Sequence, residues 1–128
     1  MVVKHYKKKK KILSIKNVTI LTVQTTSNNT IIHAQCSDQA NLVVSAGIAG
    51  LTGARRSTVY ASQQTALLMG DKLLEKRIKT AIVCFKGFGR GRKSVMKSLK
   101  KKKIKILQMF DMTSLAHNGC RPSKKRRL

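Results

Sequence analysis

The apolar positions follow two different periods along the chain, and these periods predict the order of its secondary structure. Residues 12–25 are rich in Ile, Val and Thr, with apolar side chains at both parities from Val18 to Val23. This pattern is typical of a strand that is buried on both faces in the middle of a sheet. After a turn at 27–29, residues 30–36 alternate in character and predict the return strand. Residues 42–46 follow a second turn at 38–41 and complete an antiparallel three-stranded meander.

The second half of the chain alternates helices with strands. Ser57 or Thr58 can cap a helix that runs to about Arg77. Strands are expected at 80–85 and 104–112, with a helix between them at about 92–102. The apolar residues expected to face the core are Leu67, Gly70 and Leu74 with Ala66, Met69 and Leu73 on the first helix, and Val95, Met96 and Leu99 on the second.

The predicted order β-β-β-α-β-α-β is that of an α/β protein with a mixed five-stranded sheet and helices packed on it. A length of 128 residues fits a single domain with a modest core. We expect the globular α/β domain at 12–116, a basic N-terminal arm at 1–11 and a basic C-terminal tail at 117–128. In the tail, Asn118-Gly119 predicts a turn and Pro122 a stiff exit.

Positive charge dominates the composition. The chain has 28 Lys and Arg against four acidic residues, for a net charge of +24. Six of the basic residues fall within residues 1–11, ten between Lys86 and Lys105, and five between Arg121 and Arg127. Such charge favours a nucleic acid as partner, because phosphate contacts release condensed counterions. Binding to an anionic membrane would need a basic amphipathic helix, and no convincing one is found, so no membrane partner is expected.

The cysteines and histidines do not predict a metal site. Cys36, Cys84 and Cys120 are far apart, which disfavours a disulfide framework and fits a reducing compartment. His33 with Cys36, and His117 with Cys120, could in principle form a zinc site. Residues three apart on a strand point to opposite faces, however, so we expect no metal and no cofactor. Residues 1–11 lack the apolar core of a secretory signal and the pattern of a transit peptide.

Catalysis is not expected either. The four acidic residues, Asp38, Asp71, Glu75 and Asp111, are scattered and predict no carboxylate cluster for a metal-dependent nuclease. His117 lies near a serine and a cysteine in one polar loop, which is not a catalytic triad. The sequence therefore predicts a protein that is not an enzyme.

Two short segments have features that favour phosphate binding. Residues 87–93 follow a strand and open a helix, and their glycines and helix N-terminus favour an anion. The P-loop spacing is absent and a dinucleotide fingerprint lacks its third glycine; the plain alternative is a glycine-rich turn with solvated charges. Arg55 and Arg56 precede the first helix, where they oppose the helix dipole unless an anion neutralises them. Aromatic residues make up only 4%, so base stacking is not expected to be the main mode of recognition.

Four blocks carry a resemblance to a known family: 27–32, 46–58, 86–92 and, most specifically, 111–128 with its sequence DMTSLAHNGCRPSKKRRL. The chain resembles the small-subunit ribosomal protein eleven family in its bacterial and organellar form, over about residues 15–128. It departs from the family pattern at Phe88 and Ser123, where proline is usual, and at Lys93, where an acidic residue is usual.

The resemblance implies a ribonuclease-H-like fold, no enzymatic activity, and a place on the platform of the small subunit, bound to ribosomal RNA and neighbouring proteins near the messenger exit path. The high Lys and Ile content and the departures from the family pattern suggest an organelle-encoded copy. Because plastid members of the family usually stay closer to the bacterial pattern, the resemblance implies a mitochondrial rather than a plastid ribosome. The alternative is a free RNA-binding or RNA-chaperone module of the same fold. The residues expected to contact RNA are Lys7, Lys8, Lys9, Lys10, Lys11, Asn28, Asn29, Arg55, Arg56, Ser57, Lys86, Gly87, Gly89, Arg90, Gly91, Arg92, Lys93, His117, Asn118, Gly119, Arg121, Lys124, Lys125, Arg126 and Arg127.

Overall fold

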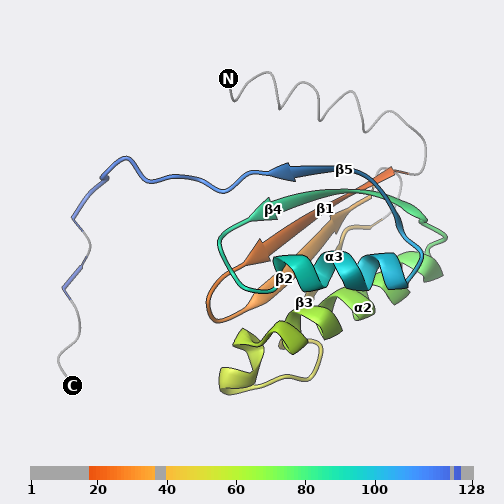
Figure 1. Ribbon diagram of the computed structural model, residues 1–128, viewed down its shortest axis with the longest axis horizontal. Helices are drawn as coiled ribbons and strands as arrows, with labels where there is room; N and C mark the ends of the chain where they lie inside the picture. The colour runs from red at the N-terminus through yellow and green to blue at the C-terminus, as the bar shows by residue number, and fades with distance from the viewer. Residues whose placement is uncertain (1–17, 37–39, 122, 125–128) are drawn as a thin grey trace.

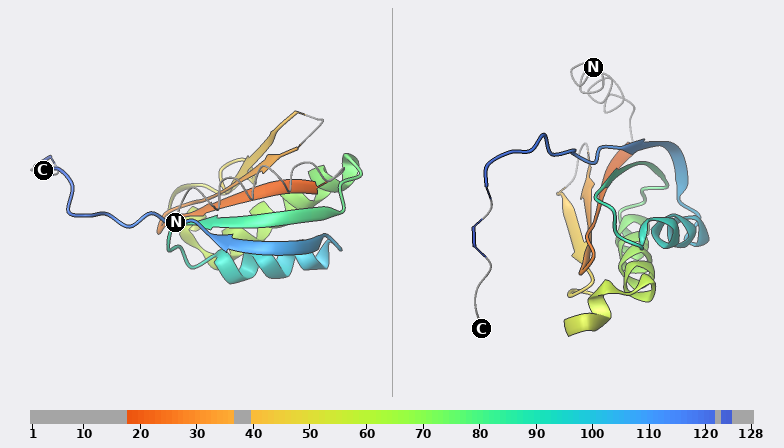
Figure 2. Two further views of the ribbon diagram at one scale, coloured as in Figure 1. Left: turned by 90° about the horizontal axis from the view of Figure 1, so that it is seen from above. Right: turned by 60° about the vertical axis from the view of Figure 1, so that its left-hand side comes forward.

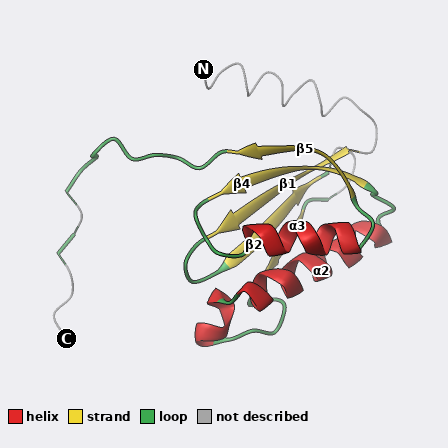
Figure 3. Ribbon diagram, viewed as in Figure 1, coloured by secondary structure: helices red, strands yellow, loops and turns green. Residues whose placement is uncertain are grey.

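The computed structural model describes residues 18–36, 40–121 and 123–124. The basic arm, the first six residues of the first predicted strand, part of the predicted 38–41 turn, Pro122 and residues 125–128 lie outside the described residues. The elements within them (Figures 1 and 3) are β1 (Val18–Thr25), β2 (Thr30–Gln35), β3 (Leu42–Ser45), the 3₁₀-helix η1 (Gly53–Ser57), α2 (Val59–Glu75), β4 (Thr80–Lys86), α3 (Arg92–Lys101) and β5 (Lys105–Asp111).

The five strands form one mixed sheet in the order β3-β2-β1-β4-β5. β2 is antiparallel to both β1 and β3, whereas β4 is parallel to β1 and β5 is parallel to β4. The single α/β domain, the three-stranded meander and the central position of the first strand were all predicted and are confirmed. The ribonuclease-H-like label stays an expectation from the resemblance.

The central strand β1 is buried on both of its faces. Leu21 and Val23 belong to the main core, on the side where the helices pack. Val18 and Ile20 point to the other side and form a smaller apolar cluster with Ile82 of β4 and neighbouring residues. This two-sided burial explains why apolar residues occur at both parities in β1 rather than alternating with polar ones.

Both α-helices cover the same face of the sheet and pack against each other (Figure 2). The core-facing side of α2 is formed by Ala66, Met69, Gly70 and Leu73, all of which are buried. The predicted stripe was wrong at Leu74, which is 37% exposed. Each step along a helix turns by about 100°, so the line through Leu73 faces the sheet and Leu74 turns away from it.

On α3, Val95 and Leu99 are buried as predicted, whereas Met96 is only half-buried at the edge of the main core. Ser98 is also buried, which the apolar pattern did not predict.

Both helices end with a left-handed residue that is not glycine. Arg77, after α2, has φ 57°, and the N–H groups of Arg77 and Ile78 donate to the carbonyls of Leu74 and Leu73. Lys103, after α3, has φ 58° and lies in the same pattern of bonds. This is the Schellman arrangement, in which glycine is the usual residue. The helices therefore stop slightly before the predicted ends at 77 and 102.

The start of α2 is capped by Thr58, whose Oγ1 accepts a hydrogen bond from the N–H of Ala61 at 3.1 Å. Ser57, the other predicted cap, instead donates to the carbonyl of Ala54 and closes η1. The segment 53–57, which directly precedes the predicted helix, is a short 3₁₀-helix. Among the described residues, no helix is both long enough and apolar enough to cross a membrane.

Candidate nucleic-acid interface

Three of the segments expected to contact RNA meet at one end of the sheet. β1, β4 and β5 are parallel, so the hairpin turn after β1, the glycine loop after β4 and the tail after β5 all leave from the carboxyl end (Figure 1). η1 and the start of α3 lie at the same end. The carboxyl end of parallel strands is the usual place for a binding site in α/β proteins.

A pocket of about 610 Å³ lies between the hairpin turn, the end of η1 and the glycine loop. It brings together five of the residues predicted from the sequence, Asn28, Ser57, Gly87, Gly89 and Arg90. The remaining lining residues are Thr25, Thr26, Ser27 and Phe88.

The hairpin turn holds itself in shape with its own polar groups. The N–H of Asn29 donates to Thr26 Oγ1 at 3.0 Å, and the N–H of Thr30 donates to Asn29 Oδ1 at 2.9 Å. The amide oxygen of Asn29 is therefore engaged within the turn, whereas Asn28 is exposed at its tip. Arg55 and Arg56 are both exposed on η1, close to the pocket residue Ser57.

The glycines of the second loop allow it to pack closely on the rest of the chain. A Cβ at Gly87 would lie 2.2 Å from the carbonyl oxygen of Thr25, and one at Gly89 2.5 Å from that of Thr26. A Cβ at Gly91 would lie 1.9 Å from Ser62 Oγ. The N–H of Gly89 donates to the Thr25 carbonyl, so this donor is already used inside the protein.

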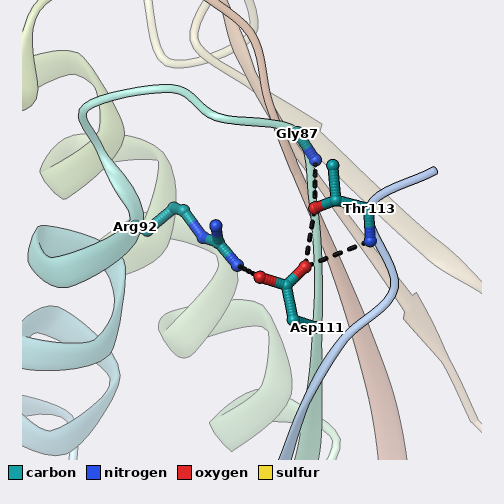
Figure 4. A network of polar contacts seen from close by, with 4 residues as sticks. All are labelled: Gly87, Arg92, Asp111 and Thr113. Carbon is teal, nitrogen blue, oxygen red and sulfur yellow. Dashed lines mark hydrogen bonds and ion pairs between the residues drawn. The ribbon is translucent and has the colours of Figure 1, made fainter. Parts of the chain in front are cut away.

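A network of polar contacts joins the glycine loop to the beginning of the tail (Figure 4). Asp111, at the end of β5, forms an ion pair with Arg92 and accepts hydrogen bonds from the side chain and the N–H of Thr113, at 2.6 and 3.1 Å. Thr113 Oγ1 accepts a bond of 3.1 Å from the N–H of Gly87. The hydrogen bond from the Thr113 side chain, followed by that from Arg92, lowers the pKa of Asp111 to about 2.

This network changes the interpretation of Arg92. Its guanidinium lies 5.0 Å from the ring centre of Phe85, in a cation–π contact, and is paired with Asp111. Lys86, Arg90 and Lys93 have exposed side chains at the same end of the sheet. These three, rather than Arg92, present the charge of the loop to the solvent.

The ten basic residues between Lys86 and Lys105 are divided between two ends of the sheet. α3 runs from the carboxyl end back to the opposite end, where β5 begins (Figure 1). Lys100, Lys101, Lys103 and Lys105 are exposed at that opposite end. The sequence alone could not show this division, because it does not reveal that α3 places half of these basic residues at the opposite end of the sheet.

In the tail, His117, Asn118, Gly119, Arg121 and Lys124 are all exposed. Asn118 and Gly119 have φ of 65° and 36°, as expected for the predicted turn. The tail extends away from the body of the domain (Figure 2). Residues Lys125 to Arg127 and Lys7 to Lys11, which were also expected to contact RNA, lie outside the described residues.

Two of the four acidic residues that were considered for catalysis have structural partners. Asp71 pairs with Lys102 and Asp111 with Arg92, while Asp38 lies outside the described residues. In the part of the chain that the structure describes, no group of three or more His, Cys, Asp and Glu residues could hold a metal ion.

Cys36 and Cys84 are buried, and Cys120 is exposed in the tail. Cys36 lies in the core on the helix side of the sheet, where it accepts a hydrogen bond from Thr19.

Some residues of the site could not be found from the sequence. Thr25 and Thr26 line the pocket and Thr113 belongs to the polar network, but a threonine in the sequence carries no signal of either role. Phe88 was noticed only as a departure from a family pattern.

An exposed basic rim around a pocket at the carboxyl end of an α/β sheet is typical of proteins that bind polyanions. The comparisons with known proteins are more specific. Residues 19–127 match the family model described as ribosomal protein S11. The chain therefore belongs to the ribosomal protein S11 family.

The chain is 42% identical over 110 residues to small ribosomal subunit protein uS11m of Prototheca wickerhamii, covering 85% of this chain and 86% of that protein. It is 37% identical over 122 residues to small ribosomal subunit protein uS11 of Francisella tularensis subsp. novicida (strain U112), covering 94% of each. It is also 37% identical over 128 residues to the uS11 of Solibacter usitatus (strain Ellin6076), covering 98% of this chain and 92% of that protein. The predicted resemblance to the bacterial and organellar form is thus confirmed.

Proposed function

We propose that this protein is a structural constituent of the small ribosomal subunit, which binds ribosomal RNA with the carboxyl end of its sheet and with its tail. Family membership and the net charge of +24 support the proposal. We choose this surface because the hairpin turn, η1, the glycine loop and the start of the tail all lie at one end of the sheet.

The finer placement follows from the family resemblance. We propose that the protein lies on the platform of the subunit, beside neighbouring platform proteins and near the messenger exit path, and that it has no enzymatic activity. A mitochondrial ribosome is the preferred location, supported by the relative named uS11m; a plastid ribosome is the alternative.

A free RNA-binding or RNA-chaperone module of the same fold is the second candidate. Sedimentation of a cell or organelle extract at moderate salt separates the two. The proposed function requires the protein to travel with small subunits, and a pool found only in the light fractions would contradict it.

The tail can be tested through the salt dependence of binding to a transcript of the small-subunit ribosomal RNA. Deleting residues 124–128 removes four basic side chains. We expect weaker binding, and a slope of log K against log salt that falls by about one for each phosphate that the shortened chain no longer neutralises.

The matched control replaces four exposed lysines at the opposite end of the sheet, Lys100, Lys101, Lys103 and Lys105, with alanine. This removes the same charge and should lower the slope much less. Equal slopes for the two variants would mean that binding follows net charge alone and would contradict the proposed surface.

A further inference from the structure

The pocket at the carboxyl end of the sheet contains an aromatic ring that the fold itself does not bury. Phe88 is 75% exposed, whereas Phe85, three residues earlier, is 8% exposed and belongs to the core. An exposed phenyl ring leaves apolar surface in water and gives the folded chain little in return. The backbone that carries the ring is nevertheless held in place, because the glycines on either side of Phe88 are packed against the hairpin turn.

The other walls of the pocket are polar. Asn28, Ser57 and Arg90 are exposed around it, and Thr25 is fully buried in its wall. The hydroxyl of Thr25 is the one buried side-chain oxygen or nitrogen without a hydrogen-bond partner among the described residues. Because this oxygen has no accessible surface, a ligand in the pocket reaches the exposed side chains of Asn28, Ser57 and Arg90 rather than Thr25.

We propose that this pocket takes one unstacked RNA nucleotide, with its base against the ring of Phe88 and its phosphate near Arg90. This inference rests on the proposed function, because it names one contact within the RNA surface. A base offers a flat face to the phenyl ring and polar atoms on its edge for the exposed side chains of Asn28 and Ser57. A volume of about 610 Å³ lies within the range of about 300–1,000 Å³ typical of pockets that hold small ligands.

The chemistry of the rim excludes a purely apolar ligand. Arg90 is an exposed cation, and the surrounding loop carries Lys86 and Lys93 as well, which favours an anionic group next to the ring. A nucleotide combines the two properties in a single unit. This one stacking contact is compatible with the low aromatic content, since it does not need an extended platform of rings.

The test uses the full chain and two RNA hairpins that differ at one position. One carries a single bulged nucleotide, and the other carries an abasic site at the same bulge. Stacking on an aromatic side chain is expected to make the wild type prefer the first hairpin by about 5- to 150-fold. Phe88→Leu keeps an apolar side chain without an aromatic face and should lose the preference, whereas Phe88→Tyr should retain it.

Tyr60 offers a matched control, because it is an exposed aromatic residue, 58% accessible, that does not line the pocket. Tyr60→Leu should leave the preference unchanged. Urea unfolding confirms that the variants are folded, which the exposure of Phe88 leads us to expect.

A transcript of the small-subunit ribosomal RNA separates this inference from the proposed function. Wild-type protein that fails to bind the transcript would contradict the proposed function itself. The wild type could instead bind the transcript with a steep salt dependence and yet bind the bulged and the abasic hairpin equally well. That result would contradict the proposed nucleotide pocket but not the proposed function. An unchanged preference in Phe88→Leu would overturn it equally.

Discussion

Gly91 provides a sharp test of why the second loop is rich in glycine. Its φ and ψ are −79° and −8°, which alanine adopts without strain. In a Gly91→Ala variant, however, the new Cβ would lie 1.9 Å from Ser62 Oγ and 2.4 Å from Ser62 Cβ. Rotating the serine hydroxyl cannot remove the second contact, so α2 or the loop must move.

The magnitude follows from two opposing effects. Overpacking in a tight interior site costs about 1–3 kcal/mol. Replacing glycine with alanine also lowers the conformational entropy of the unfolded chain, which stabilises the folded state by about 0.4–1 kcal/mol. We therefore expect a net destabilisation of about 1–2 kcal/mol, which for a domain of this size lowers Tm by about 4–8 °C.

Urea unfolding followed by circular dichroism measures this effect, and a double-mutant cycle assigns its cause. In a Ser62→Gly background both clashing atoms are absent, so the Gly91→Ala cost should fall by about 1 kcal/mol or more. The control Gly47→Ala meets nothing closer than Ser45 Oγ at 3.7 Å and should change the stability by less than about 0.5 kcal/mol.

A Gly91→Ala protein as stable as the wild type, or equal costs in the two backgrounds, would refute this explanation of the glycine. Unchanged stability combined with weaker RNA binding would point to the other explanation, that the glycine makes room for a phosphate.

Polar contacts of the fold can be tested by the same unfolding measurements. Because its pKa is lowered from 3.8 to about 2, Asp111 stabilises the folded chain above about pH 4 and loses this effect as the pH falls towards 2. In urea unfolding, Asp111→Asn should thus be less stable than wild type above about pH 4, with the difference disappearing near pH 2; a constant difference would contradict the network with Thr113. Thr58→Ala removes the N-cap of α2 and should lower the free energy of unfolding by about 0.5–2 kcal/mol. Ser57→Ala should change it little. A larger loss in Ser57→Ala than in Thr58→Ala would show that the cap was wrongly assigned.

Most of the fold could be predicted because each element carries its own local pattern. β1 was recognisable from apolar residues at both parities, and that same feature placed it in the centre of the sheet. The helix ends were less predictable, because Arg77 and Lys103 occupy left-handed positions where glycine is the usual signal. The orientation of α2 depended on how it packs with α3, and no local pattern contains that information.

The site was predictable in its parts but not in its arrangement. The glycine loop, the paired arginines and the tail each stand out by composition. That the hairpin turn, the glycine loop and the tail share one end of the sheet follows from the parallel pairing of β1, β4 and β5, which joins residues far apart in sequence. The role of Arg92 was missed for the same reason, because its partner Asp111 lies 19 residues away.

The hydrogen bond between Thr113 and Gly87 has a consequence for how the two parts of the surface act together. It fixes the point from which the tail leaves, and the eleven residues from there to Lys124 reach at most roughly 40 Å. Once the body of the domain is bound to RNA, the tail is confined to this small volume. Its effective concentration at the neighbouring RNA is then about millimolar, as for other short tethers. The protein then dissociates only when the body and the tail are released from the RNA at the same time. A tail with little affinity of its own can therefore greatly prolong the lifetime of the complex.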